Sequence, residues 1–253
     1  MPSNTKKKGK HLAVSTSKPT APAPPAATPP NWPAFTPLIP EPDLALHDLL
    51  PGQILTIPHL WTASLCKTYV SFLASLPLTT TPGKPKKGDA VRVNDRFQAH
   101  DPVFAERLWH ETALKTLVSG RGEEGDLWGG QVIGLNPNIR LYRYSKGQFF
   151  DQHYDDSNIV TLPGSPSIAA RTTWTLLLYL TSASNGCIGG ETVFYPEPPS
   201  KKSRDPPPPP IVVELEAGLA LLHRHGVDCM LHEGREVLEG EKWVIRSDLC
   251  VRR

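Results

Sequence analysis

After Gly130 the sequence divides into short runs of aliphatic, aromatic and β-branched residues, each bounded by glycine, proline, asparagine or aspartate. Runs of this kind are typical of strands, and their close spacing favours an all-β sandwich or barrel over a sheet with alternating helices. No glycine-rich nucleotide-binding loop follows any of them. The expected strands are residues 139–144, 149–155, 173–180, 192–195, 211–215, 219–223 and 242–251.

Helical patterns precede these strands. Residues 62–77 place large apolar side chains at helical spacing on one face. A second helix is expected after Asp101, which can cap it, because Pro102 suits a first helical turn and Gly120 can end it. Residues 90–97, between the two, alternate as a strand does. Helices followed by strands predict a mostly β fold: a jelly roll, or double-stranded β-helix, with an N-terminal helical buttress (α+β).

Proline is concentrated in two segments. Residues 1–30 hold seven of the 28 prolines, five lysines and almost no large apolar side chain, so we expect a disordered basic tail followed by one domain over residues 31–253. The lysine run at 6–10 suits either a nuclear import signal or a solubilising tail. Residues 196–210 hold eight prolines and are expected to form an insertion outside the sheet. Within it, Pro206–Pro210 predicts a polyproline II rod that either binds an SH3 or WW partner or has no partner.

The charge distribution excludes several classes of protein. Five of the 27 basic residues lie in the tail, which leaves 22 bases against 25 acids in the rest of the chain. This slightly acidic body disfavours a nucleic-acid partner. No apolar run approaches the length of a membrane span, and the four cysteines are widely spaced, as is typical of a reducing compartment. We therefore expect an intracellular protein, cytoplasmic or nuclear, without a membrane partner; the oligomeric state stays open.

A histidine and a carboxylate stand close together in one expected strand. His153 and Asp155 are two residues apart and so share a strand face, whereas Asp156 would point to the other face. A second histidine from a neighbouring strand would complete a two-histidine, one-carboxylate site, which suits Fe(II) and leaves three coordination positions open. His232 is far enough along the chain to return on such a strand. Lys242 begins an apolar strand, where a desolvated amine requires an anion.

Three motifs carry a family resemblance. Residues 144–155 (YSKGQFFDQHYD) resemble the Y-x-x-G-x-x-[FY]-x-x-H-x-D stretch of prolyl 4-hydroxylase-like Fe(II)/2-oxoglutarate dioxygenases. Residues 189–194 (GGETVF) resemble their G-G-x-T-x-F strand, and residues 232–243 (HEGREVLEGEKW) their H-x-x-x-P-V-x-x-G-x-K-W. The motifs occur in the family order. Two features depart from the pattern: Glu236 replaces the usual proline, and the insertion at 196–210 lengthens a connection that is often short.

The resemblance implies a set of cofactors and their ligands. It implies Fe(II), with 2-oxoglutarate as cosubstrate and O₂, and ascorbate as a candidate reductant. Oxidative decarboxylation of 2-oxoglutarate to succinate and CO₂ would accompany hydroxylation of a substrate C–H bond. The C5 carboxylate of 2-oxoglutarate would pair with Lys242, and Tyr144 and Tyr179 would help to hold it. The catalytic iron ligands would be His153, Asp155 and His232.

Several further residues are candidates for the substrate side. Arg92, Asn94 and Arg96 share one face of an expected strand, where they could bind a peptide backbone or an acidic group, or form the solvated face of an edge strand. Arg246 lies four residues after Lys242 and faces the same way, so it could hold 2-oxoglutarate or an acidic group of the substrate. We assign 2-oxoglutarate to Lys242 and the substrate side to Arg246.

Two histidines are set aside. His223 and His225, in the sequence His-Arg-His-Gly, are interpreted as part of a solvated turn.

The leading functional hypothesis is hydroxylation of a prolyl residue in a protein or peptide. The alternatives are hydroxylation of a small molecule, oxidative demethylation of nucleic acid, which the acidic body disfavours, and a catalytically silent jelly roll that binds partners. An intact metal triad together with Lys242 argues against the silent module.

Overall fold

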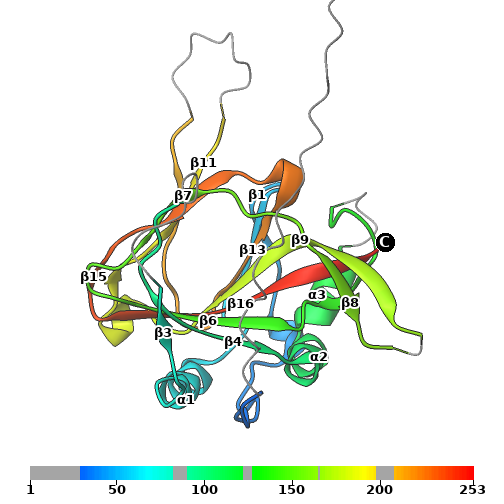
Figure 1. Ribbon diagram of the computed structural model, residues 1–253, viewed down its shortest axis with the longest axis horizontal. Coiled ribbons are helices and arrows are strands. Elements are labelled where there is room, and N and C mark those ends of the chain that lie inside the picture. The colour runs from blue at the N-terminus through cyan, green and yellow to red at the C-terminus, as the bar shows by residue number, and fades with distance from the viewer. Residues whose placement is uncertain (1–28, 82–89, 122–126, 165, 198–207) are drawn as a thin grey trace, which may run out of the picture.

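The computed structural model describes residues 29–81, 90–121, 127–164, 166–197 and 208–253, and its largest element is a ten-stranded sheet (Figure 1). The strands follow the order β1-β2-β13-β9-β16-β6-β4-β3, with β5 paired to β16 and β8 to β9. Nearly all of the expected tail, its lysine run and the start of Pro206–Pro210 lie outside the described residues. The bounds are β1 His47–Leu50, β2 Ile54–Ile57, β3 Thr79–Thr80, β4 Asp95–His100, β5 Val132–Leu135, β6 Asn138–Ser145, β8 Ile159–Leu162, β9 Ile168–Tyr179, β13 Ala220–Arg224 and β16 Glu241–Arg252.

A smaller sheet lies across from the large one. Its four strands follow the order β12-β11-β14-β7, and a separate pair, β10 with β15, lies beside it. Figure 1 shows the two sheets enclosing a common interior, and the predicted jelly-roll fold is therefore confirmed. The bounds are β7 Phe150–His153, β10 Ile188–Gly189, β11 Thr192–Tyr195, β12 Ile211–Val213, β14 Leu231–Gly234 and β15 Val237–Glu239.

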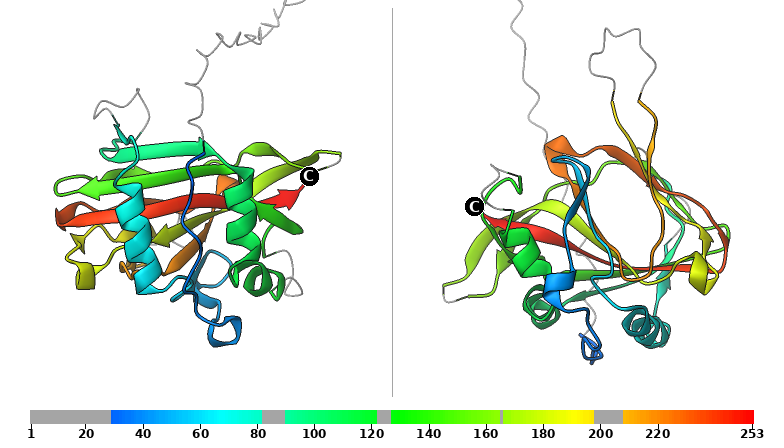
Figure 2. Two further views of the ribbon diagram at one scale, coloured as in Figure 1. Left: turned by 90° about the horizontal axis from the view of Figure 1, so that it is seen from below. Right: turned by 180° about the vertical axis from the view of Figure 1, so that it is seen from behind.

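Three α-helices cover the outer face of the large sheet, as predicted for the buttress (Figure 2). They are α1 Ala63–Leu73, capped by Thr62, α2 Pro102–His110, capped by Asp101, and α3 Leu114–Ser119. The single helix expected from 101 to 120 is interrupted, because the Thr112 hydroxyl donates to the Leu108 carbonyl and accepts from the Leu114 amide. Short 3₁₀ turns occupy Glu41–Asp43, Ala183–Asn185 and Gly226–Asp228. No helix in the described ranges is long and apolar enough to cross a membrane.

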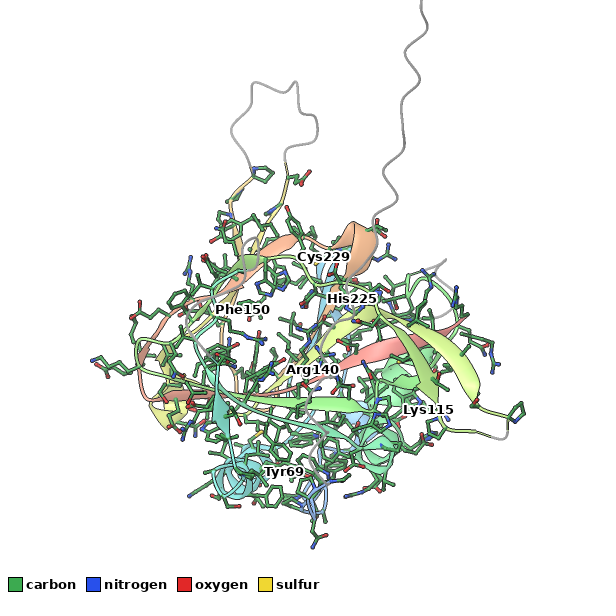
Figure 3. The ribbon with its side chains drawn as sticks, in the orientation of Figure 1. Tyr69, Lys115, Arg140, Phe150, His225 and Cys229 are labelled. Carbon is green, nitrogen blue, oxygen red and sulfur yellow. The ribbon has the colours of Figure 1, made fainter. Side chains whose placement is uncertain are left out.

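The alternation of side chains along β16 separates the two sides of the large sheet. Trp243, Ile245 and Leu249 pack with the helices in the main apolar core. Val244 instead packs in the inner cluster, and Lys242 and Arg246 line the pocket between the sheets. Because successive residues of a strand point to opposite faces, one strand contributes both to the core and to the site. Figure 3 shows the same division, with Tyr69 among the helices and Phe150 and Cys229 on the side of the smaller sheet.

Candidate metal and cosubstrate site

A pocket of about 450 Å³, including its open mouth, lies between the two sheets. Apolar and aromatic side chains make up much of its wall, and a few charged and imidazole groups converge inside it. This combination is typical of a small-molecule site. All four residues that the sequence proposes for iron and for the C5 carboxylate line it: His153, Asp155, His232 and Lys242.

The pairing of β7 with β14 brings two histidines together. His153 and His232 are direct partners in the ladder, and their ring centroids lie 4.2 Å apart. Each Nδ1 donates to a backbone carbonyl, that of Asp151 at 2.7 Å and that of Met230 at 2.9 Å. This fixes the proton on Nδ1 and leaves both Nε2 atoms as metal donors, 3.9 Å from Oδ1 and 3.8 Å from Oδ2 of Asp155.

The protonation state of both imidazoles suits a metal ligand. Burial lowers the pKa of His153 to about 3, and the neighbouring His232 contributes in the same direction. Burial also lowers the pKa of His232. Both rings are therefore neutral near pH 7, which is the form that binds a metal ion.

Asp155 lies just beyond the end of β7 and is held by an arginine from the other sheet. Arg246 donates to Oδ1 at 3.0 Å and its second nitrogen lies 2.9 Å from Oδ2, which also accepts from the Thr175 hydroxyl at 2.9 Å. Burial by itself would raise the pKa of Asp155, but Arg246 and the surrounding imidazoles outweigh it and hold that pKa well below its usual range. Oδ1 keeps a lone pair on the side of His153, so the carboxylate can still bind a metal ion.

Arg246 therefore contacts Asp155, one of the proposed iron ligands. It lines the pocket, as its spacing from Lys242 predicts, but its guanidinium is bound to Asp155 and lies 3.5 Å from Asp248. The assignment of Arg246 to the substrate side stays a prediction, and these contacts favour a positioning role instead.

Lys242 is a buried cation. Its Nζ donates to the Gly190 carbonyl at 2.6 Å, and no carboxylate in the described ranges forms an ion pair with it. Burial lowers its pKa to about 8. A Cβ at Gly190 would lie 3.2 Å from the lysine Cδ, and the residue has φ +78°, so glycine here makes room for the lysine stem. An anion in the pocket would supply the missing partner.

The two tyrosines expected beside Lys242 both lie next to it. The ammonium is 5.5 Å from the Tyr144 ring centroid and 5.4 Å from that of Tyr179. Tyr144 lines the pocket, whereas the Tyr179 hydroxyl is hydrogen-bonded at 2.6 Å to Thr192. Tyr144 is thus part of the pocket wall, and Tyr179 lies behind it; the role of both in holding 2-oxoglutarate stays a prediction.

The interpretation of His223 and His225 as a solvated turn is wrong. His223 is 2% exposed, and its Nε2 lies 3.7 Å from Asp155 Oδ2. His225 is also buried, bonded to the hydroxyls of Thr175 and Thr172. The position of His223 in the expected strand 219–223 could have indicated this burial. Side chains alternate between the two faces of a strand, and His223 lies on the inner face of β13.

The segment before β4 contributes one arginine near the pocket. Arg92 forms an isolated bridge with Phe150, and its guanidinium lies 5.0 Å from the Phe150 ring centroid and 5.5 Å from that of Tyr142. Both rings line the pocket. Arg92 therefore presents a cation beside the pocket wall.

The other two members of the expected polar face lie elsewhere. Asn94 is fully buried, and its side-chain oxygen accepts from the Thr81 hydroxyl at 2.9 Å. Arg96 lies in β4 and is not among the residues that line the pocket. The strand expected over 90–97 begins at Asp95, so the three residues do not form one continuous face.

Comparison with known proteins agrees with this geometry. Residues 139–247 match the model of the 2OG-Fe(II) oxygenase superfamily, whose members use Fe(II), 2-oxoglutarate and O₂. The predicted resemblance is therefore confirmed at the level of this superfamily, and the cofactors it implies are those of the family. No curated protein matches the chain.

Three solved structures show the same fold. A prolyl-4-hydroxylase from Pseudomonas putida is similar with a TM-score of 0.53 and 16% identity over 81% of this chain and 96% of that one. HygX from Streptomyces hygroscopicus, with nickel, 2-oxoglutarate and hygromycin B bound, gives 0.50 and 18% over 79% and 83%. An oxidoreductase of the 2OG-Fe(II) oxygenase family from Burkholderia pseudomallei gives 0.50 and 15% over 80% and 87%.

Removal of the arginine that holds Asp155 should destabilise the protein strongly. We expect Arg246→Met to lower the free energy of unfolding by about 3–5 kcal/mol, because it leaves a buried carboxylate without its partner. Arg246→Lys keeps the charge and should lose less. Urea unfolding of the three proteins at pH 7 measures the difference.

The pH dependence provides the control. The stabilisation from the lowered pKa of Asp155 is fully present above the pKa of a free aspartate, about 3.9, and is lost as the pH falls below it. The difference in the free energy of unfolding between wild type and Arg246→Met should therefore become smaller at acidic pH. A difference in unfolding free energy below about 1 kcal/mol at pH 7 would show that the ion pair with Arg246 does not hold Asp155 in place.

Proposed function

We propose that this protein is an Fe(II)- and 2-oxoglutarate-dependent dioxygenase that hydroxylates a C–H bond of a prolyl residue in a protein or peptide. The observation that carries the proposal is the charge arrangement of one pocket. Two neutral imidazoles and a carboxylate face it from one side, and the buried ammonium of Lys242 faces it without a carboxylate partner in the described ranges. These groups fit a divalent cation and a dicarboxylate bound side by side.

The residues have distinct roles in this proposal. Nε2 of His153 and of His232 and Oδ1 of Asp155 would hold Fe(II), and Arg246 keeps the carboxylate in place from behind. Lys242 would bind the C5 carboxylate of 2-oxoglutarate. When bound, iron, 2-oxoglutarate and O₂ supply the oxidising chemistry that places a hydroxyl on the substrate and releases succinate and CO₂. The apolar side chains of the pocket wall would limit the access of water to this reaction.

The substrate would approach along the wall that Arg92 borders. The rings of Phe150 and Tyr142 offer an apolar surface for a pyrrolidine ring, and the Arg92 guanidinium can donate to a peptide carbonyl or pair with an acidic side chain. The closeness of the three motifs to the prolyl 4-hydroxylase pattern supports a prolyl target.

Anaerobic titration of the Fe(II)-loaded protein with 2-oxoglutarate tests the cofactor site. Chelation gives a weak visible charge-transfer band, which we expect in the wild type and not in Lys242→Ala, because the far carboxylate then has no cation to bind. Lys146→Ala, at an exposed position on the turn after β6, is the matched control and should keep the band. His153→Ala and Asp155→Ala should abolish 2-oxoglutarate turnover.

An absent band in wild-type protein that demonstrably holds iron would contradict the proposal. A catalytically silent jelly roll that binds partners would then be the better interpretation. Wild-type turnover in His153→Ala or Asp155→Ala would overturn the ligand assignment.

Binding of 2-oxoglutarate should weaken above about pH 8. The pKa of Lys242 is lowered by burial to about 8, so the lysine loses its charge above that pH and the ion pair with the cosubstrate is lost. The Kd from the charge-transfer titration should then rise by about tenfold per pH unit. Lys242→Arg stays charged throughout and should give a flat profile. A flat wild-type profile between pH 7 and about 9.5 would exclude Lys242 as the titrating partner.

The class of substrate can be tested with a library of proline-containing peptides and a set of free amino acids and small acids. We expect peptides to stimulate succinate formation and to gain one oxygen atom by mass spectrometry. Arg92→Ala should raise the KM for the peptide while the charge-transfer band is retained. Arg96→Ala, away from the pocket, is the control. Stimulation by small molecules alone would favour the small-molecule hydroxylase.

A further inference from the structure

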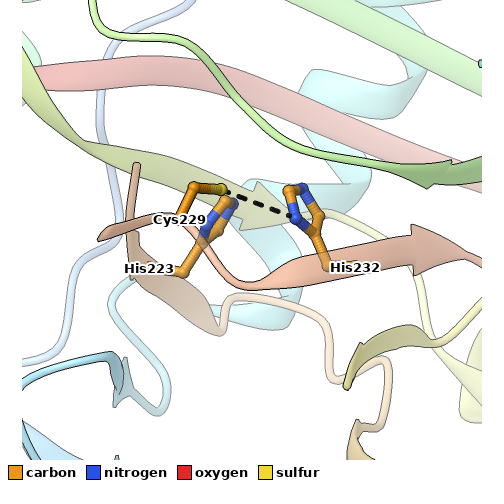
Figure 4. A group of neighbouring side chains, drawn as sticks. All are labelled: His223, Cys229 and His232. Atoms are coloured by element: carbon orange, nitrogen blue, oxygen red, sulfur yellow. Dashed lines mark hydrogen bonds between the residues drawn. The ribbon is translucent and has the colours of Figure 1, made fainter. Parts of the chain in front are cut away.

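A second group of metal donors shares the His232 ring with the first, and Figure 4 shows its three members. It consists of His223 from β13, Cys229 just after the 3₁₀ turn at Gly226–Asp228, and His232 itself. One donor atom of each lies within 4.8 Å of the others, and Cys229 Sγ is 3.9 Å from His232 Nδ1. The role proposed above uses only His232 of these three.

His223 offers a donor atom that the fold leaves without a partner. The residue is 2% exposed, and its Nε2 makes no hydrogen bond within the described part of the chain. Asp155 Oδ2 lies 3.7 Å from this nitrogen, which is too long for a hydrogen bond. An unpaired ring nitrogen is costly at such a buried position, and a bound cation would satisfy it.

Cys229 is placed to bind a metal as a thiolate. Its sulfur is a free thiol, half-buried, and accepts a hydrogen bond from the Asp155 amide at 3.2 Å. An N–H aimed at sulfur stabilises the thiolate more than the thiol. The sulfur would bind a metal ion as a thiolate, and its proton would leave to solvent as the metal ion binds.

We propose that His223, Cys229 and His232 form a second metal site, specific for a thiophilic cation such as Zn(II). Two imidazoles and one thiolate match the donors that Zn(II) prefers, and three protein ligands leave a fourth position for water. Magnesium and calcium ions require oxygen donors and would not bind here.

The two metal sites cannot be occupied at the same time, because each requires a different tautomer of the His232 ring. For iron, His232 carries its proton on Nδ1, where it bonds to Met230, and binds through Nε2. Nδ1 is the nitrogen that faces Cys229, so zinc requires that nitrogen bare, and the proton must then lie on Nε2. Zinc at the second site therefore removes a ligand from the first. This regulatory consequence rests on the proposed function, whereas binding at the second site does not.

Cobalt(II) titration reads out the sulfur ligand directly, because a Co(II)–thiolate bond gives a near-ultraviolet charge-transfer band. The titration is made in His153→Ala, which lacks one ligand of the first site and keeps all three of the second. We expect the band there and in the wild type. It should be lost when Cys229→Ser or His223→Phe is added; the second replacement keeps an aromatic ring next to Phe194. Cys250→Ser, which removes a buried thiol remote from the pocket, should keep it.

Competition with a chromophoric chelator then gives the affinity for Zn(II). Cys229→Ser removes a direct ligand and should weaken zinc binding by at least roughly 10- to 100-fold, which is the loss typical of removing an outer-shell partner of a metal. Absence of the thiolate band, or equal zinc affinity in Cys229→Ser and wild type, overturns the second site. If the second site fails this test while the Fe(II)–2-oxoglutarate band is present, the zinc proposal is wrong and the proposed dioxygenase function is unaffected. If the cobalt–thiolate band is present and the Fe(II)–2-oxoglutarate band is absent, the zinc site is supported and the dioxygenase proposal is wrong.

Discussion

The buried ion pair between Asp155 and Arg246 is the interaction on which the site depends. It joins the end of β7 in the smaller sheet to β16 in the large one, and so fixes the spacing of the two sheets where the pocket lies. Burying both charges is costly, and a hydrophobic pair of the same volume could be equally stable. What the pair provides is a carboxylate with one orientation and one free lone pair. Thr175 and His225 continue the network behind it.

The strand alternation of the large sheet makes this arrangement compatible with a stable core. The outer faces of β9, β13 and β16 pack in the main apolar core with the helices, and the inner faces of β13 and β16 supply polar groups to the pocket. The residues that line the pocket are therefore separate from those of the main apolar core. The same rule explains why a histidine at the end of β13 is buried beside Asp155 rather than exposed in a turn.

The sequence predicts those parts of the site that local spacing or a motif determines. The structure brings His153, Asp155, His232 and Lys242 together as expected, although Asp155 lies past the strand that was to carry it. The contacts of Arg246, His223 and Cys229 could not be predicted, because they depend on which strands face each other across the interior. Local spacing also misleads at Thr112, where one side-chain hydroxyl interrupts a helix, and at Asn94, which turns inward to Thr81.

A backbone carbonyl controls what His232 can bind. The Met230 carbonyl accepts only from a protonated Nδ1, so it selects the tautomer whose Nε2 faces Asp155. Cys229 lies one residue before Met230 in the chain, and its sulfur approaches the same Nδ1. The short segment between the 3₁₀ turn and β14 thus carries both the group that stabilises the iron-binding tautomer and the group that competes for it. The balance between two metals would then be set by one hydrogen bond of 2.9 Å, at a position that contributes no ligand of its own.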